Sequence, residues 1–293
     1  VSLVAQIKKY FQQEIPLITL FQEATIENLA ALLNKQTSPY TSTPLVSIQP
    51  SGSTRPFFCV HPIGGSVFCY IELARHLGKE QPVYGLQACG LNGEQKPFTS
   101  IEEMATYYIE SLRTIQPQGP YLLGGWSLGG LIAFEMAQQL CKQGEEIALL
   151  ALFDSDILTP NNKPDNNGFW SDDKLVAAFA GHLFGGHYID DQPLFLGNFQ
   201  KLDTDGQLNF VLEKAKAIGI LPTVFEYSQL YQLFQVYLAN FNAMQNYLPK
   251  SYSGDIKLFQ ANESRSLSSS SLVLARSEIV SGEVDIKIVP GNH

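Results

Sequence analysis

The chain has 293 residues, of which 45% are hydrophobic and 16% are charged, and its formal net charge is −9. This composition excludes the disordered class, and the length is sufficient for one large domain. The acidic balance argues against a nucleic-acid-binding surface, which requires clustered Lys and Arg. Since no apolar run reaches membrane-spanning length and no signal peptide is visible, we expect a cytoplasmic protein with no membrane partner.

The first 33 residues predict a small helical piece. Leu3, Ile7 and Phe11 recur at helical spacing, and a second helix is expected to begin near Thr25. Because so short a segment cannot bury a core alone, we expect it to be a fragment of a larger fold. The polar, Pro/Ser/Thr-rich stretch NKQTSPYTSTP that follows predicts a linker.

Beyond this linker, strand-like and helix-like runs alternate. Helices are expected at 67–78, 100–115 and 128–143. Short apolar strands are expected at 45–48, 57–60, 82–87, 120–123, 147–153, 255–260 and 284–289. Alternation of this kind predicts an α/β fold, in which helices cover both faces of a mostly parallel sheet.

An all-helical stretch interrupts the alternation between residues 169 and 248. Three helix-like runs begin near Trp170, Asp205 and Tyr227 with no strand between them. So long a helical insertion in an α/β sheet predicts a cap or a separate subdomain. The serine-rich run SLSSSS at 266–271 predicts a loop.

Four cysteines stand at positions 59, 69, 89 and 141, and no two of them form a C-x-x-C pair. Cys59 lies in the apolar run FFCV, which is typical of a buried strand. We therefore expect buried free thiols in a reducing compartment rather than disulfides.

The stretch Gly125-Trp126-Ser127-Leu128-Gly129 matches the G-x-S-x-G pattern of a nucleophile elbow. The match alone is weak, but an apolar run precedes it and the helix-forming run LIAFEMAQQL follows it. At such an elbow the serine has a strained backbone, so side chains at positions 125 and 129 would clash. Ser127 is therefore the expected nucleophile, and the alternative is an ordinary glycine-rich loop.

A nucleophilic serine needs a histidine base, and the chain offers five histidines. Triads on this fold run serine, acid, histidine along the chain, so His61 fails the order. His293 follows the last expected strand and is the expected base. The remaining three lie in helix-like segments or the helical insertion: His76, His182 and His187.

The acid that orients the histidine is expected on a loop after a strand, between the serine and the histidine. The run IALLALFD places Asp154 directly at a strand end, and Asp156 follows two residues later. Asp154 is favoured because Asp156 lies further into the loop. The alternative is that either residue only caps the turn.

Two backbone amides are expected to form an oxyanion hole. One belongs to Leu128, directly after the serine. The second is expected from the loop HPIGG, residues 61–65, with Ile63 as the favoured donor and Gly64 as the alternate. The alternative is that HPIGG is only a tight turn between a strand and a helix. No metal site is predicted.

Four stretches, taken in order, resemble the type I thioesterase domain that ends non-ribosomal peptide synthetase and polyketide synthase assembly lines. They are FFCVHPIGGSVFCYIELARHL, YLLGGWSLGGLIAFEMAQQL, LLALFDSD and IVPGNH. The resemblance covers residues 45–293 and implies an α/β-hydrolase fold with a helical lid at about 160–248. It also implies a catalytic triad of Ser127, Asp154 and His293.

Residues 1–36 are similar to the C-terminal part of a peptidyl carrier domain, followed by a linker at 37–44. In that family the serine that carries phosphopantetheine lies just upstream, so we expect the attachment serine before Val1. The resemblance implies a carrier domain in cis as partner, with its acyl- or peptidyl-phosphopantetheine arm, and upstream modules of the same assembly line.

The resemblance implies that Ser127 takes the chain from the phosphopantetheine thiol as an ester. Hydrolysis or macrocyclisation then releases the chain. Aromatic residues of the lid either line an acyl channel or pack the lid helices: Phe169, Trp170, Phe184, Tyr231, Phe234, Tyr237 and Phe241.

Two other functions fit part of the sequence. A stand-alone carboxylesterase or lipase explains the triad, but it does not explain a carrier fragment joined through a linker. A catalytically silent α/β-hydrolase used as a binding module belongs to a different class. It is the weaker reading because every triad position is filled.

Overall fold

The computed structural model describes residues 43–155, 172–185, 199–263 and 279–293, and the single residues 7, 10, 11 and 30. Only those four residues of the expected carrier fragment, 1–36, are therefore described. The SLSSSS loop at 266–271 lies outside the described residues. The chain divides into two compact units. One comprises Ser42–Cys89, Gln95–Asp165 and Ala239–His293, and the other comprises Val1–Thr41, Gly90–Glu94 and Asn166–Leu238.

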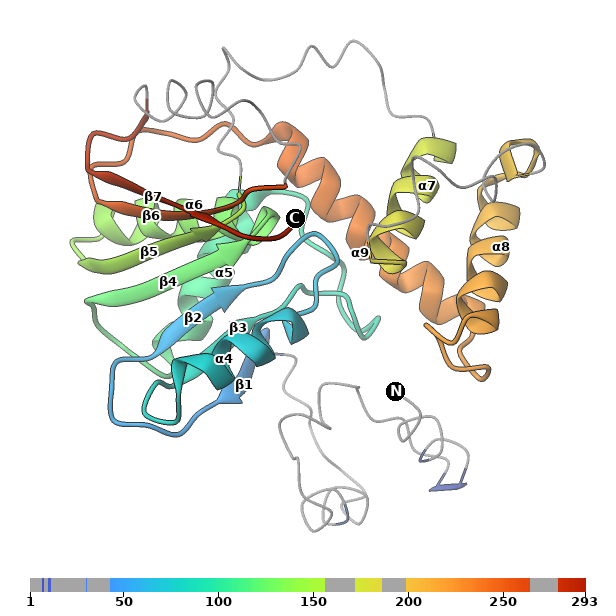
Figure 1. The fold of residues 1–293 in the computed structure, drawn as a ribbon, viewed down its shortest axis with the longest axis horizontal. Helices are drawn as coiled ribbons and strands as arrows, with labels where there is room; N and C mark the ends of the chain where they lie inside the picture. The colour runs from blue at the N-terminus through green and yellow to red at the C-terminus, as the bar shows by residue number, and fades with distance from the viewer. Residues whose placement is uncertain are drawn as a thin grey trace. The chain divides into compact units, whose positions relative to one another are not determined.

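A seven-stranded sheet forms the centre of the unit that contains Ser42–Cys89 (Figure 1). Its order is β1-β3-β2-β4-β5-β6-β7, and β1 pairs antiparallel with β3 while the remaining pairs are parallel. The mostly parallel sheet predicted from the alternating pattern is confirmed. The strands are β1 (Leu45–Gln49), β2 (Phe57–Val60), β3 (Val83–Leu86), β4 (Tyr121–Trp126), β5 (Ile147–Phe153), β6 (Ile256–Ala261) and β7 (Val284–Val289).

Helices cover both faces of this sheet. Figure 1 shows α4 (Ile71–Leu77) on one face, and α5 (Ile101–Arg113) and α6 (Leu128–Lys142) on the other. The helix expected at 67–78 begins as the short 3-10 helix η1 (Phe68–Tyr70) before it becomes α4. The Ser100 side chain caps α5 by accepting a hydrogen bond from the Glu103 amide.

Burial of the strands in the core of this unit explains why their sequences are apolar runs. All four residues of β2 are buried, because the strand lies between β3 and β4 with helices on both faces. Helix α6 is also buried on most of its circumference, from Leu128 to Leu140. This burial places the segment after Ser127 in the core of the unit that contains the sheet.

The other unit is helical in the part that the structure describes. It contains α7 (Asp172–Leu183), the short η3 (Phe199–Lys201) and α8 (Thr204–Ala217). Helix α9 (Tyr227–Asn246) begins in this unit and ends in the unit of the sheet. The predicted all-helical insertion is thus confirmed for its described residues.

Aromatic side chains pack the helices of this unit. The ring of Phe179 meets Phe234 and Tyr237 edge-on, at centroid distances of 5.4 and 5.5 Å. Of the aromatic residues named above, Tyr231 is exposed, and Phe169 and Trp170 lie outside the described residues. Four others are buried, namely Phe184, Phe234 and Tyr237 in this unit and Phe241 in the unit of the sheet.

All four cysteines are free. Cys59 and Cys89 are buried as expected, but Cys69 and Cys141 are exposed. The prediction of burial is wrong for these two, because one lies in η1 and the other in the last turn of α6, on outward-facing positions. In the described part of the chain, no helix is both long and apolar enough to cross a bilayer.

Candidate active site

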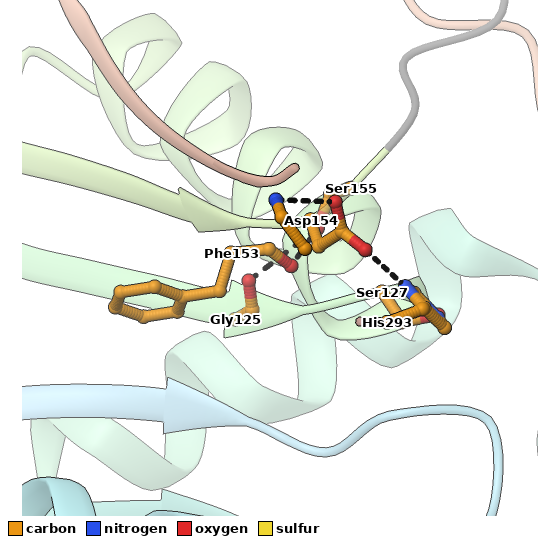
Figure 2. Close-up of polar contacts among 7 residues, drawn as sticks. Gly125, Ser127, Phe153, Asp154, Ser155 and His293 are labelled. Atoms are coloured by element: carbon orange, nitrogen blue, oxygen red, sulfur yellow. Dashed lines mark hydrogen bonds and ion pairs between the residues drawn. The ribbon is translucent and has the colours of Figure 1, made fainter. Parts of the chain in front are cut away.

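Ser127 lies at the turn between β4 and α6 (Figure 2). Its backbone has φ 57° and ψ −123°, an unusual conformation for a residue with a side chain. The Ser127 amide donates a hydrogen bond of 2.9 Å to the Phe153 carbonyl, so the neighbouring strand β5 holds the turn in place. This strained strand-to-helix turn is the geometry of a nucleophile elbow.

The glycines around Ser127 are required by close backbone approach. A Cβ on Gly125 would lie 2.2 Å from the carbonyl of Gly129, and a Cβ on Gly129 would lie 2.2 Å from the Val60 oxygen. A Cβ on Gly130 would lie 2.0 Å from Ser155 Oγ. The five-residue motif leaves Gly130 unexplained, although the doubled glycine in the sequence was a visible signal of this contact.

His293 lies between Ser127 and Asp154. Its Nε2 is 3.0 Å from Ser127 Oγ, and its Nδ1 is 2.6 Å from Asp154 Oδ2. Figure 2 shows the Asp154 carboxylate turned toward the imidazole. His293 is therefore within hydrogen-bonding distance of both Ser127 and Asp154, although the three residues are far apart in the sequence. This is the arrangement in which an acid orients a base and the base activates a hydroxyl.

Asp154 is held by backbone contacts on both sides. It has a positive φ of 45°, and its amide donates a hydrogen bond of 2.7 Å to the Phe259 carbonyl of β6. Its other carboxylate oxygen, Oδ1, accepts a hydrogen bond of 3.1 Å from the Ala261 amide. These bonds leave Oδ2 directed at His293. The rival acid Asp156 lies outside the described residues.

The imidazole of His293 is half exposed and is flanked by an aromatic ring. The His293 and Trp126 ring centroids are 5.3 Å apart, with the planes tilted by 45°. The His293 side chain is 51% exposed, whereas the Asp154 side chain is 10% exposed. The imidazole is thus partly accessible to solvent, while the Asp154 carboxylate is largely shielded from it.

The other four histidines either have different neighbours or lie outside the described residues. His76 is on the exposed face of α4, where its Nδ1 is 2.7 Å from the Glu72 carbonyl. His182 is on α7, with its ring 5.8 Å from that of Tyr237. His187 lies outside the described residues, and His61 is fully buried at the end of β2.

The loop HPIGG begins beside the elbow. Val60, the last residue of β2, pairs with Gly125 of β4, so the loop leaves the sheet next to Ser127. The Tyr70 hydroxyl ties the two strands together, because it donates to the Val60 carbonyl and accepts a hydrogen bond of 2.8 Å from the Trp126 amide. No pattern in the sequence singled out Tyr70, which lies in a helix-like run.

Both expected oxyanion donors lie in this region. Leu128 is the first residue of α6, and Ile63 follows β2 by three positions, with Gly64 next. Within the described ranges, the amides of these three residues donate no recorded hydrogen bond to another backbone or side-chain group. Amides at such positions remain able to donate to a ligand.

Burial lowers the pKa of His61 from 6.5 to about 4. Since the folded-state pKa lies below the ordinary value, neutral His61 contributes stability above pH 6.5, and that contribution is lost as the pH falls toward 4. This difference between the two pKa values corresponds to a loss of about 3 kcal/mol in the free energy of unfolding between pH 6.5 and pH values below 4. We expect an NMR titration to find the His61 ring neutral down to about pH 4, and titration near 6.5 would contradict its burial.

Among the described residues, no three His, Cys, Asp or Glu side chains are grouped so that they could hold a metal ion. A serine hydroxyl, an imidazole and a shielded carboxylate provide a nucleophile, a general base and an orienting acid.

Comparison with known proteins places this geometry in a family. The family model described as "Thioesterase domain" matches residues 55–293. The chain belongs to the thioesterase domain family. The match covers the elbow, Asp154 and His293, and it includes the helical insertion.

Relatives of this thioesterase domain are nonribosomal peptide synthetases. The chain is 32% identical over 264 residues to a dimodular nonribosomal peptide synthase of Bacillus subtilis (strain 168), covering 89% of this chain and 10% of that protein. It is 38% identical over 186 residues to malpinin synthetase of Mortierella alpina, covering 61% of this chain and 2% of that protein. The chain thus spans a tenth or less of the length of these two relatives.

Solved structures agree with the fold. A four-domain holo nonribosomal peptide synthetase, with AMP and glycine bound, superposes with a TM-score of 0.78 at 33% identity, covering 99% of this chain and 22% of that chain. The NocB thioesterase domain, in covalent complex with a fluorophosphonate nocardicin G analogue, superposes with a TM-score of 0.59 at 23% identity, covering 85% of this chain and 90% of that chain. At that identity the second likeness shows the fold alone. These neighbours, with the mostly parallel sheet, identify the fold as the α/β-hydrolase type.

Proposed function

We propose that this thioesterase domain releases an acyl or peptidyl chain from a carrier-bound phosphopantetheine thioester, with Ser127, His293 and Asp154 as its catalytic triad. The observation that carries the proposal is the position of His293, 3.0 Å from Ser127 Oγ and 2.6 Å from Asp154 Oδ2. Membership in the thioesterase domain family and relatedness to peptide synthetases support the thioester as the bond that is attacked.

The polarity of the array follows from its acid. An ionised carboxylate only accepts hydrogen bonds, so His293 Nδ1 carries a proton toward Asp154 and Nε2 is left to accept the Ser127 proton. Ser127 Oγ attacks the thioester carbonyl, and the amides of Leu128 and of Ile63, or alternatively Gly64, stabilise the oxyanion. His293 then protonates the leaving thiol, which gives an acyl-Ser127 ester.

The ester is released by a second nucleophile. Water gives a free acid, whereas a hydroxyl or amine of the bound chain gives a ring. His293 removes the proton of either nucleophile, and Ser127 Oγ recovers it as the ester breaks.

The proposed partner is a carrier domain in cis that brings the chain on its phosphopantetheine arm, within an assembly line that includes upstream modules. Residues 1–36 are proposed to be the C-terminal part of this carrier domain and 37–44 a linker, followed by the thioesterase domain at 45–293 with its lid at about 160–248. The likeness to a dimodular synthase and to a four-domain synthetase supports this arrangement.

A carboxylesterase or lipase would use the same triad. The observation against it is that the relatives described above are peptide synthetases. A silent binding module would have no reason to keep the strained backbone of Ser127, whose φ of 57° costs stability.

The proposal is tested by giving the domain a carrier-linked or N-acetylcysteamine thioester of a peptide and weighing the products. A product with the mass of the free acid means hydrolysis, and a product lighter by one water means cyclisation. A thioester that stays intact, while simple esters are cleaved, would favour the carboxylesterase instead.

A further inference from the structure

Two successive carbonyls of the HPIGG loop are held by buried side chains. The Pro62 oxygen lies 2.8 Å from His61 Nδ1 and also accepts a hydrogen bond of 2.9 Å from the Gly65 amide. The Ile63 oxygen accepts a hydrogen bond of 2.8 Å from Asn240 Nδ2. This loop carries the second oxyanion donor of the proposed function.

Holding these carbonyls fixes the directions of the loop amides. In a trans peptide the carbonyl and the N–H of the next residue point in opposite directions. The only cis bond in the described ranges is Gly119–Pro120, so the loop peptides are trans. The contacts at the Pro62 oxygen therefore set the Ile63 N–H, and the contact from Asn240 to the Ile63 oxygen sets the Gly64 N–H.

The tautomer of His61 follows from its two contacts. A carbonyl oxygen has no proton to give, so Nδ1 must donate to Pro62. Burial keeps the ring neutral, which leaves Nε2 as an acceptor for the Tyr108 hydroxyl at 2.7 Å. Burial also raises the pKa of Tyr108 well above 10.0, so this hydroxyl keeps its proton and donates it. Tyr108 thus fixes the His61 tautomer that holds the loop.

Asn240 reaches the same loop from a distant part of the chain. It lies on α9 and is 1% exposed, and its contact with Ile63 spans 177 positions of sequence. A second buried contact holds this end of α9, because the Tyr247 hydroxyl donates a hydrogen bond of 2.9 Å to Glu135 of α6. The amide of Asn240 is therefore delivered by an anchored helix.

We propose that His61 and Asn240 are positioning residues that fix the amides of the HPIGG loop in their donor orientation before substrate arrives. The inference rests on the proposed function, because it concerns the oxyanion hole of that site. An oxyanion hole stabilises the transition state most when its donors need no reorganisation during reaction. Here the side chains of His61, in the loop after β2, and Asn240, on α9, hold the donors in place before reaction.

The first test compares two variants of the same helix. Asn240→Leu removes the donor while keeping the branched shape and the number of heavy atoms of the side chain, and Asn242→Leu makes the same change at an exposed position. For Asn240→Leu we expect kcat for a thioester to fall about ten- to hundred-fold with KM within about twofold, less than the loss of a whole oxyanion donor. Asn242→Leu should leave both constants unchanged. A folded Asn240→Leu protein with unaltered kcat would overturn the role of Asn240.

A second assay separates this inference from the thioesterase assignment. The rate of Ser127 labelling by a fluorophosphonate depends on the oxyanion hole but not on a thioester. If the unaltered domain is labelled and yet leaves thioesters intact, the proposed function fails, while a labelling rate reduced at least tenfold in Asn240→Leu still supports the inference. If the unaltered domain is not labelled, both fail.

The role of His61 is tested without substituting His61 itself. Nitrogen-15 NMR of the unaltered domain should show His61 protonated at Nδ1 and bare at Nε2. Tyr108→Phe keeps the ring but removes the hydroxyl, so it should shift the tautomer toward Nε2 protonation and slow fluorophosphonate labelling severalfold. A ring protonated at Nε2 in the unaltered domain would overturn the assignment.

Discussion

Ser127→Ala is expected to abolish chain release and to leave the chain on its carrier. The substitution removes the only atom proposed to form a bond with the substrate, and loss of a triad serine lowers kcat by about 10⁴- to 10⁶-fold. Mass spectrometry of a loaded carrier, in cis or supplied as a separate domain, measures the fraction that stays acylated. The fold should survive, since the alanine adds no atom to the crowded elbow.

Ser251→Ala is the matched control, because Ser251 is exposed and lies outside the elbow. It should release the chain at the rate of the unaltered domain. Multiple turnovers by a folded Ser127→Ala protein would remove Ser127 from the mechanism.

Asp154→Asn is expected to lower kcat by about 10⁴-fold, although it changes only one atom of the side chain. Asp154 Oδ2 lies 2.6 Å from His293 Nδ1 and accepts its hydrogen bond, whereas an amide nitrogen at the same place would donate and favour the wrong tautomer. Steady-state kinetics with an N-acetylcysteamine thioester give the ratio of kcat for Asp154→Asn to kcat for the unaltered domain. KM should change little, because Asp154 acts through His293 rather than on substrate.

Asp156→Asn is the informative comparison, since Asp156 was the second expected acid. It should cost little activity. If Asp156→Asn were the more damaging of the two substitutions, the orienting acid would have to be reassigned.

The sheet was predictable because each strand is short, apolar and bounded by polar turns. β2 illustrates this, since a strand buried on both faces has no alternation to obscure its apolar run. The glycines of the elbow were predictable for a related reason. Backbone packing at Gly125 and Gly129 leaves no room for Cβ, so the constraint is visible as residue type.

The partners of Ser127 were predictable only through chain order. Asp154 and Ser127 lie 139 and 166 positions from His293, and no local pattern records such contacts. Asp154 and His293 could be predicted because the carboxyl ends of parallel strands lie at one edge of the sheet, where the residues of the following loops meet. Their catalytic roles remain predictions.

The contacts that hold the HPIGG loop were not predictable. Asn240 looks like any polar residue on a helix, and its burial depends on where α9 runs. No sequence pattern indicates the role of Tyr70 either, although its hydroxyl joins β2 to the elbow. His61 was set aside because its position before Ser127 excludes it as the base, and that order says nothing about a role in orienting the loop.

The central claim is that Ser127 carries the chain as an ester between attack and release. Incubating the domain briefly with an acyl-N-acetylcysteamine thioester, quenching in acid and digesting the protein allows each peptide to be weighed. The account predicts the acyl mass on the peptide that contains Ser127, with one thiol released for each chain acylated. Thiol release with no acyl group on Ser127, or an acyl group on another residue, would contradict it.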